Sequence, residues 1–155
     1  AVVDYAHTPD ALKSVLEALK PHCQGRLKLV FGCGGDRDMG KRPEMAKVAE
    51  QFADDILVTD DNPRFEDPEA ITNDILKGFS RPLEMLVEHD RKRAIQQVLS
   101  TASERDVVLI AGKGHESWQE KKGERTFFSD LEEVCLVLGL EANNHSIDIK
   151  ELAHD

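Results

Sequence analysis

The chain has 155 residues, of which 40% are hydrophobic and 32% charged, and this length and composition fit one domain with a normal core. Its 30 acidic and 20 basic residues leave a net charge of −10, which argues against nucleic acid as the main partner because phosphate binding needs a basic surface. The sequence has no apolar run near the roughly 20 residues that span a membrane, and no signal peptide opens it. We therefore expect neither a nucleic-acid partner nor a membrane segment.

The cysteines and histidines indicate neither a disulfide framework nor a metal centre. Cys23, Cys33 and Cys135 are odd in number, widely spaced and without a Cys-x-x-Cys pair, which favours reduced thiols in the cytoplasm. The six His and three Cys also lack the spacing of zinc ligands. The sequence begins with Ala instead of Met, and residues 1–4 are typical of the end of a strand. We therefore expect a domain of a longer polypeptide.

Predicted strands and helices alternate along the chain. The expected strands are 1–4, 27–31, 56–59, 83–87 and 107–111, and the expected helices begin at Thr8, near Pro43, and at Asp67, Asp90 and Ser129. This alternation predicts a Rossmann-like α/β fold, with an open, mostly parallel, twisted sheet of about six strands and helices on both faces. The run 107–111 is the most uniformly apolar and is expected at the centre of the sheet.

Three loops are expected to meet at one edge of this sheet. Right-handed crossovers bring the carboxyl ends of parallel strands to the same edge, where open α/β sheets build their binding sites. The loops are 32–42, 60–67 and 112–127. The polar and acidic stretch 141–155 predicts a weakly packed or disordered tail with a small helix at 150–153, so the domain itself is expected to cover residues 1–140.

The glycine-rich loop after the second strand fails two nucleotide motifs. Arg37 stands where G-x-G-x-x-G needs its third glycine. Gly35, Gly40 and Lys41 come closer to a phosphate loop, but Arg42 stands where a hydroxyl must reach magnesium. The loop either merely turns the chain or presents Arg37 to a ligand, and the basic cluster of Arg37, Lys41 and Arg42 could hold a small anion.

The segment Asp60-Asp61-Asn62-Pro63-Arg64 directly follows the predicted strand 56–59. Asp, Asn and Pro are common turn formers, and Arg64 could be a solvated charge. The alternative is one wall of a pocket for a ligand with ammonium and carboxylate groups, because a guanidinium grips a carboxylate through a two-point fork. The position at a strand end favours the pocket.

Two further segments could line the same site. In Gly112-Lys113-Gly114-His115-Glu116 the glycines let the backbone approach a ligand, and Glu116 could accept an ammonium, while the roles of Lys113 and His115 stay undetermined. No nucleophile motif accompanies His115, so we assign no catalytic residue, and Trp118 is expected to pack in a hairpin. His7, ahead of the first helix, either supports the helix start or contacts a nucleotide.

Four segments, in this order, resemble the C-terminal domain of the Mur ligases, and the diaminopimelate-adding members in particular. They are D-Y-A-H-T-P-D at 4–10, G-C-G-G-D-R-D at 32–38, D-D-N-P-R at 60–64 and G-K-G-H-E at 112–116. The resemblance runs from Ala1 to about Leu140. It implies one domain of a three-domain cytoplasmic enzyme of peptidoglycan synthesis.

The resemblance also implies the chemistry. ATP and Mg²⁺ would activate a glutamate carboxyl of UDP-N-acetylmuramoyl-L-alanyl-D-glutamate as an acyl phosphate, which the amine of meso-diaminopimelate then attacks. The family's phosphate loop and magnesium-binding residues belong to its central domain, so this chain alone is expected to be inactive.

The site residues implied by the resemblance fall into two groups. Those for meso-diaminopimelate are Arg37, Asp61, Asn62, Pro63, Arg64, Gly112 and Glu116, and those near the nucleotide are Asp4, Tyr5 and His7. Arg64 would read the second carboxylate, which lysine lacks, and Glu116 with the Gly112 carbonyl would take the distal ammonium.

Two alternatives stay open at this point. The first is a stand-alone module that binds an amino acid or a muropeptide without catalysis. The second is a folate or other peptide-adding ligase of the same superfamily, although the D-N-P-R segment speaks against it.

Overall fold

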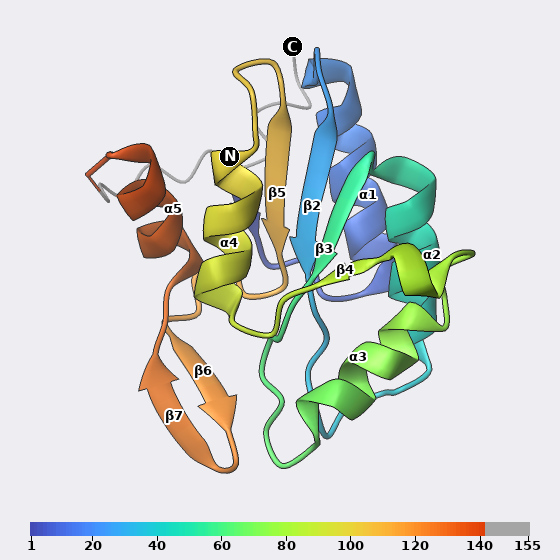
Figure 1. Ribbon diagram of the computed structural model, residues 1–155. Helices are drawn as coiled ribbons and strands as arrows, with labels where there is room; N and C mark the ends of the chain where they lie inside the picture. The colour runs from blue at the N-terminus through green and yellow to red at the C-terminus, as the bar shows by residue number, and fades with distance from the viewer. Residues whose placement is uncertain (142–155) are drawn as a thin grey trace.

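A parallel sheet of five strands runs through the middle of the structure, in the order β1-β5-β2-β3-β4 (Figure 1). The computed structural model describes residues 1–141. The strands of the sheet are β1 (Val2–Asp4), β2 (Leu27–Phe31), β3 (Asp55–Val58), β4 (Leu86–Val87) and β5 (Val107–Ala111). A separate antiparallel hairpin consists of β6 (Trp118–Lys121) and β7 (Glu124–Phe127).

The predicted fold class is confirmed, with two corrections to the sheet. The sheet in residues 1–141 has five strands instead of about six, and β2 is its middle strand in place of β5. Strand β5 lies one place off centre because β1 pairs along its outer side. Strand β4 is only two residues long because a 3-10 turn at Pro82–Glu84 takes up the start of the apolar run 83–87.

Five helices accompany the sheet in the described residues, and they are α1 (Pro9–Leu19), α2 (Lys41–Phe52), α3 (Pro68–Leu76), α4 (Arg91–Ser100) and α5 (Asp130–Leu138). Four of them begin as the sequence predicts, because the side chains of Thr8, Asp67, Asp90 and Ser129 each accept a hydrogen bond from a backbone N–H in the first turn. Helix α2 begins at Lys41, two residues before the predicted Pro43, without such a cap.

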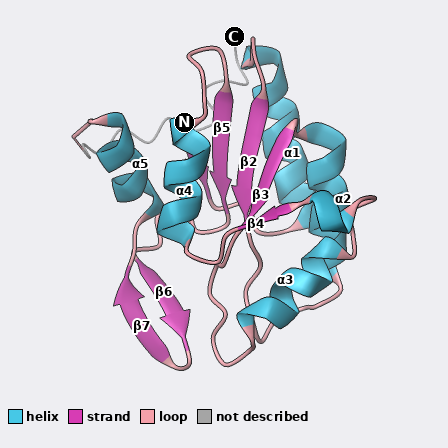
Figure 2. Ribbon diagram, viewed as in Figure 1, coloured by secondary structure: helices cyan, strands magenta, loops and turns pink. Residues whose placement is uncertain are grey.

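Helices cover both faces of the sheet, as predicted (Figure 2). Successive side chains of β2 point to opposite faces. Leu29 and Phe31 pack in the core beneath α1, α2 and α3, whereas Val30 packs beneath α4 and α5. All five residues of β2 are buried, which explains its nearly continuous apolar sequence.

The carboxyl ends of β2, β3 and β5 lie at one edge of the sheet, where the loops 32–40, 59–67 and 112–117 meet. The β6–β7 hairpin lies at this same end of the molecule (Figure 1). None of the helices in residues 1–141 has the length and apolar character to cross a membrane. Apart from residue 141, the predicted tail and its small helix at 150–153 lie outside the described residues.

Candidate functional site

A pocket of about 220 Å³ opens where the three loops and the hairpin meet. It is lined by Tyr5, His7, Gly34, Arg37, Asp61, Asn62, Arg64, Gly112, Glu116 and Trp118. The lining therefore gathers the residues predicted for the site with two exceptions, Pro63 and Asp4. It adds Gly34 and Trp118, which the sequence did not assign to the site.

The segment 60–64 divides its side chains between the pocket and the surrounding structure. Asp60 turns away and pairs with His89 at 2.7 Å and with Lys121 at 3.2 Å. Asp61 and Asn62 are buried and line the pocket. The Pro63 carbonyl accepts a hydrogen bond from the Glu66 N–H at 3.0 Å, so Pro63 shapes the loop without lining the pocket.

Arg64 joins this loop to the hairpin and also lines the pocket. Its φ of 55° is in the left-handed region, which a residue with a side chain rarely adopts. Both of its backbone groups are paired, since its N–H donates to the Glu120 carbonyl at 3.0 Å and its carbonyl accepts from the Lys122 N–H at 2.6 Å. Its guanidinium donates to the Gly35 carbonyl at 2.8 Å and has its Nε 3.8 Å from the Glu120 carboxylate.

The glycine-rich loop packs closely against the segment 60–64. The Gly35 N–H donates to the Asn62 carbonyl at 2.8 Å, and a Cβ at Gly35 would lie 1.9 Å from the Pro63 carbonyl oxygen, so only glycine fits. Arg37 is exposed and lines the pocket from this loop. Burial raises the pKa of the neighbouring Cys33 thiol to about 12, so this cysteine is no ready nucleophile.

The predicted basic cluster for a small anion is not formed. The Arg42 side chain is fully buried and pairs through two nitrogens with Glu66, both at 2.7 Å, and with Asp74 at 3.1 Å. The hydrogen bonds from Arg42 hold the pKa of Glu66 below its ordinary value. Lys41 donates to the His7 carbonyl at 2.9 Å. Arg42 is therefore neutralised by ion pairs with acidic side chains distant in the sequence. The local sequence around Arg42 does not indicate these pairs.

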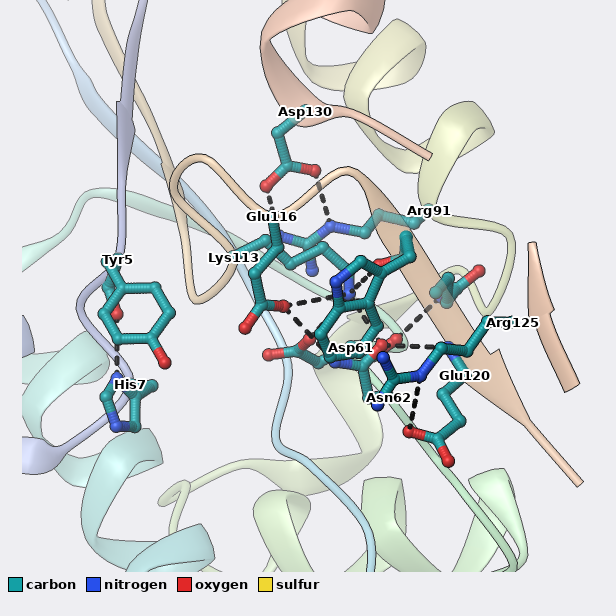
Figure 3. A network of polar contacts seen from close by, with 12 residues as sticks. Tyr5, His7, Asp61, Asn62, Arg91, Lys113, Glu116, Glu120, Arg125 and Asp130 are labelled. Carbon is teal, nitrogen blue, oxygen red and sulfur yellow. Dashed lines mark hydrogen bonds and ion pairs between the residues drawn. The ribbon is translucent and has the colours of Figure 1, made fainter. Parts of the chain in front are cut away.

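The loop after β5 contains a buried lysine whose role the sequence left undetermined. The Lys113 ammonium donates to the Asn62 side-chain oxygen at 2.8 Å and to the Trp118 carbonyl at 3.1 Å, and it lies 3.0 Å from a carboxylate oxygen of Asp61 (Figure 3). Gly112 has a φ of 120°, and a Cβ there would lie 2.9 Å from the other Asp61 oxygen. His115, by contrast, is exposed.

Two carboxylates share the side of the pocket next to Lys113. Asn62 donates through its side-chain nitrogen to Glu116 at 3.3 Å, which places Glu116 beside Asp61 (Figure 3). The Asp61 oxygen Oδ1 is buried and accepts no well-aligned hydrogen bond from residues 1–141, apart from its ion pair with Lys113. Asp61 and Glu116 give this side of the pocket an acidic character, which suits a cationic ligand group.

Trp118 is in a hairpin, as predicted, and it also borders the pocket. Its ring lies 4.3 Å from the guanidinium of Arg125 on the facing strand and 5.7 Å from the Lys113 ammonium. Such cation–π contacts fix the ring against the hairpin. A tryptophan in a polar loop with two glycines nearby was the available sequence signal for this position.

Tyr5 and His7 line the opposite side of the pocket. Their rings meet edge to face with centroids 4.6 Å apart, and His7 Nδ1 is 2.9 Å from the Tyr5 carbonyl (Figure 3). The Asp4 carboxylate accepts from the Ala6 N–H at 2.7 Å, and its carbonyl accepts from the Gly112 N–H at 3.0 Å. Asp4 therefore holds the start of two loops and does not line the pocket.

A buried arginine holds the ends of β3 and β5 together behind the pocket. Arg91 forms a two-point ion pair with Asp130, at 2.7 and 2.8 Å, and donates to the carbonyls of Asp60 and Ala111, both at 3.1 Å. Burial opposes the charge of Arg91, but the Asp130 carboxylate outweighs burial and the pKa of Arg91 is raised.

Among residues 1–141 no three His, Cys, Asp or Glu side chains lie together in a way that could hold a metal ion.

Comparison with known proteins finds relatives that are similar over most of this chain. The chain is 61% identical over 133 residues to UDP-N-acetylmuramoyl-L-alanyl-D-glutamate--2,6-diaminopimelate ligase of Pseudomonas putida, covering 86% of this chain and 27% of that protein. It is 53% identical over 141 residues to the ligase of the same name from Vibrio parahaemolyticus, covering 91% of this chain and 29% of that protein. The chain thus spans little more than a quarter of these relatives.

A solved structure is also similar. The structure of a UDP-N-acetylmuramoyl-L-alanyl-D-glutamate--2,6-diaminopimelate ligase matches 88% of this chain and 28% of its own, with a TM-score of 0.84 and 50% sequence identity. The family model of the Mur ligase, glutamate ligase domain, matches residues 1–114. With these segments at the predicted places on the sheet edge, the chain belongs to the Mur ligase family, as a C-terminal, glutamate ligase domain.

Proposed function

We propose that this chain is the amino-acid-binding domain of a cytoplasmic, ATP-dependent ligase that adds meso-diaminopimelate to UDP-N-acetylmuramoyl-L-alanyl-D-glutamate during peptidoglycan synthesis. The names of the relatives, at 53% and 61% identity, support the reaction. The residues that line the pocket support an amino acid as its ligand.

The observation that carries the proposal is that one small pocket is lined by both acidic and basic side chains. Asp61 and Glu116 lie on one side, and the guanidiniums of Arg37 and Arg64 also line the pocket, which has a volume of about 220 Å³. A zwitterionic amino acid needs both kinds of partner. Carboxylates accept its ammonium groups, and guanidiniums bind its carboxylates with defined orientation.

Arg64 is the proposed reader of the second carboxylate. Diaminopimelate differs from lysine by a carboxylate on the distal carbon, and a guanidinium fixed at the pocket wall suits that group. The distal ammonium would then lie near Glu116 and the Gly112 carbonyl. In this arrangement Pro63 contributes through the shape of the loop.

The chemistry proposed for the complete ligase assigns this domain a positioning role. ATP would phosphorylate the glutamate carboxyl of the nucleotide substrate, and Mg²⁺ would balance the phosphate charges when bound elsewhere in the ligase. The diaminopimelate amine would attack the acyl carbon, forming the amide bond as phosphate leaves and a proton is lost. Arg37 and Arg64 would hold the carboxylates of the amino acid and Glu116 its distal ammonium, and the attacking amine would be positioned through them, with Tyr5 and His7 facing the nucleotide.

The decisive experiment is a calorimetric titration of the full-length ligase, loaded with a non-hydrolysable ATP analogue, with meso-diaminopimelate and separately with lysine. We expect binding of meso-diaminopimelate at least tenfold tighter than that of lysine, since a lost charge-assisted pair is worth roughly 1–3 kcal/mol. Equal affinities would refute the assignment of the amino acid. Binding of a muropeptide without any ligation would favour a non-catalytic module.

A further inference from the structure

The structural role of Lys113 goes beyond the residues that line the pocket. Its side chain is fully buried, flanked by Gly112 and Gly114, whose φ angles are 120° and 53°. A buried ammonium is costly unless it is paired and hydrogen-bonded. Lys113 meets this condition through Asp61, the Asn62 side chain and the Trp118 carbonyl. Through its Nζ atom, Lys113 therefore connects its own loop to the segment 60–64 and to the hairpin.

Lys113 also decides which way the Asn62 amide faces. The Asn62 oxygen accepts from the Lys113 ammonium at 2.8 Å and from the Glu120 N–H at 3.0 Å. Both groups can only donate, so the amide oxygen must face them. The amide nitrogen is thereby directed to Glu116, 3.3 Å away (Figure 3).

The charge of Lys113 has a second effect on the same group. Its ammonium lies 3.0 Å from Asp61 and 3.8 Å from Glu116, between two carboxylates that would otherwise repel each other. One positive and two negative charges leave this side of the pocket with a net negative charge. This net negative charge suits a ligand ammonium, and the Lys113 ammonium reduces the repulsion between the two carboxylates.

We propose that Lys113 is a positioning residue of the amino-acid site, acting through Asn62, Asp61 and Glu116 without touching the ligand. This inference rests on the proposed function for its effect on diaminopimelate. The orientation of Asn62 that Lys113 imposes does not depend on that function and can be tested by itself.

The kinetic test uses Lys113→Met in the full-length ligase. We expect the KM for meso-diaminopimelate to rise about tenfold to a hundredfold, because a small displacement of positioning groups has effects of this size. The kcat and the KM for ATP should change less than about threefold, since the lysine contacts neither the reacting atoms nor the nucleotide side. Lys47→Met, at an exposed lysine of α2, is the matched control.

Two further variants separate the causes. Lys113→Gln keeps a donor for Asn62 but loses the charge, so its KM should lie between those of the wild type and Lys113→Met, and it serves if the Met variant fails to fold. In an Asn62→Ala background, Lys113→Met should raise the KM by a smaller factor than in the wild type, because part of the effect of Lys113 passes through Asn62. Full additivity, or equal losses in every kinetic constant, would overturn the proposal.

A substrate-free arm separates this proposal from the function. In the 155-residue chain, hydrogen exchange of the Glu120 amide should be at least about tenfold faster in Lys113→Met than in Lys47→Met, because Asn62 loses the partner that fixes its oxygen. Unchanged exchange at Glu120 would overturn the role of Lys113. If the wild-type ligase fails to use diaminopimelate while this exchange effect is present, the proposed function fails and the orienting role of Lys113 stands.

Discussion

At the scale of single residues, Arg64 has two separate roles, one for its side chain and one for its backbone. Its guanidinium lines the pocket, and its backbone adopts a φ of 55° to pair with the hairpin on both sides. The left-handed conformation costs about 1–2 kcal/mol for a residue with a Cβ. Two backbone hydrogen bonds offset that cost, so the loop holds the guanidinium in a fixed place.

The variant Arg64→Ala tests whether the guanidinium binds the ligand. It keeps the cost of the left-handed conformation, since alanine also carries a Cβ. We expect the affinity for meso-diaminopimelate to fall by roughly 1–3 kcal/mol, about fivefold to more than a hundredfold, and the affinity for lysine to stay within about threefold. Calorimetry on the full-length ligase measures both. Arg81→Ala, at an exposed arginine, is the control.

A companion variant sharpens this result. Arg64→Gly loses the same guanidinium and relieves the backbone strain, so it should bind as poorly as Arg64→Ala while being more stable to unfolding. Equal losses for diaminopimelate and lysine in either variant would contradict the role given to Arg64.

At the scale of elements, the hairpin turn carries a similar strain. Lys122 and Gly123 have φ angles of 52° and 78°, which is the pattern of a type I′ turn. Asparagine tolerates the first of these positions far better than lysine. The turn therefore leaves room for a stabilising substitution away from the pocket.

Lys122→Asn should raise the free energy of unfolding by up to about 1 kcal/mol, because Asn-Gly is a preferred pair for this turn. Urea unfolding followed by circular dichroism measures the change. At the same position Lys122→Val should lower stability, since a β-branched side chain is poorly accommodated at positive φ. An unchanged or lower stability of Lys122→Asn would argue against the type I′ turn.

The ion pair between Arg42 of α2 and Glu66 in the loop before α3 should make the stability of the protein depend on pH. Arg42 holds the pKa of Glu66 below its ordinary value of 4.5. Glu66 therefore contributes stability that is present above its ordinary pKa and is lost as the pH falls through the lowered one. Glu66→Gln removes this contribution and leaves Asp74 beside Arg42.

In urea unfolding at pH 7, Glu66→Gln should be less stable than the wild type by roughly 1–3 kcal/mol. The gap should narrow steadily as the pH is lowered from 5 to 3, because the wild type loses what the variant already lacks. A gap of constant size across this range would mean that Arg42 and Glu66 contribute little as an ion pair.

The elements differ in how far local sequence could predict them. Helix starts depend on a side chain and a backbone group a few residues apart, so Thr8 and Ser129 were readable directly. The burial of Arg42 depends on acids 24 and 32 residues further along the chain, which no local pattern reveals. Lys113 belongs to the same class, since its partner Asn62 is 51 residues away. The sequence therefore predicted which loops form the candidate site. It did not predict the ion pairs and hydrogen bonds of Arg42 and Lys113 that support those loops.

At the scale of the whole molecule, the described residues form a polar pocket at one edge of the sheet. The pocket collects its residues from one edge of the sheet, and its groups suit an amino acid. The loop 32–40 lies where a nucleotide-binding loop would be expected, yet it packs tightly on the segment 60–64 and is followed by Arg42, which is fully engaged with Glu66 and Asp74. This loop is therefore ill suited to cradle phosphates.

The 155-residue chain alone should consequently form no amide. Incubated with ATP, Mg²⁺, meso-diaminopimelate and UDP-N-acetylmuramoyl-L-alanyl-D-glutamate, it should release no phosphate above background, because the glycine-rich loop of residues 32–42 does not complete a phosphate-loop motif. The full-length ligase under the same conditions should release one phosphate for each amide formed. Phosphate release from the isolated chain that required both substrates would show that its own residues activate the carboxyl, and would place the catalytic centre at this sheet edge instead of between domains.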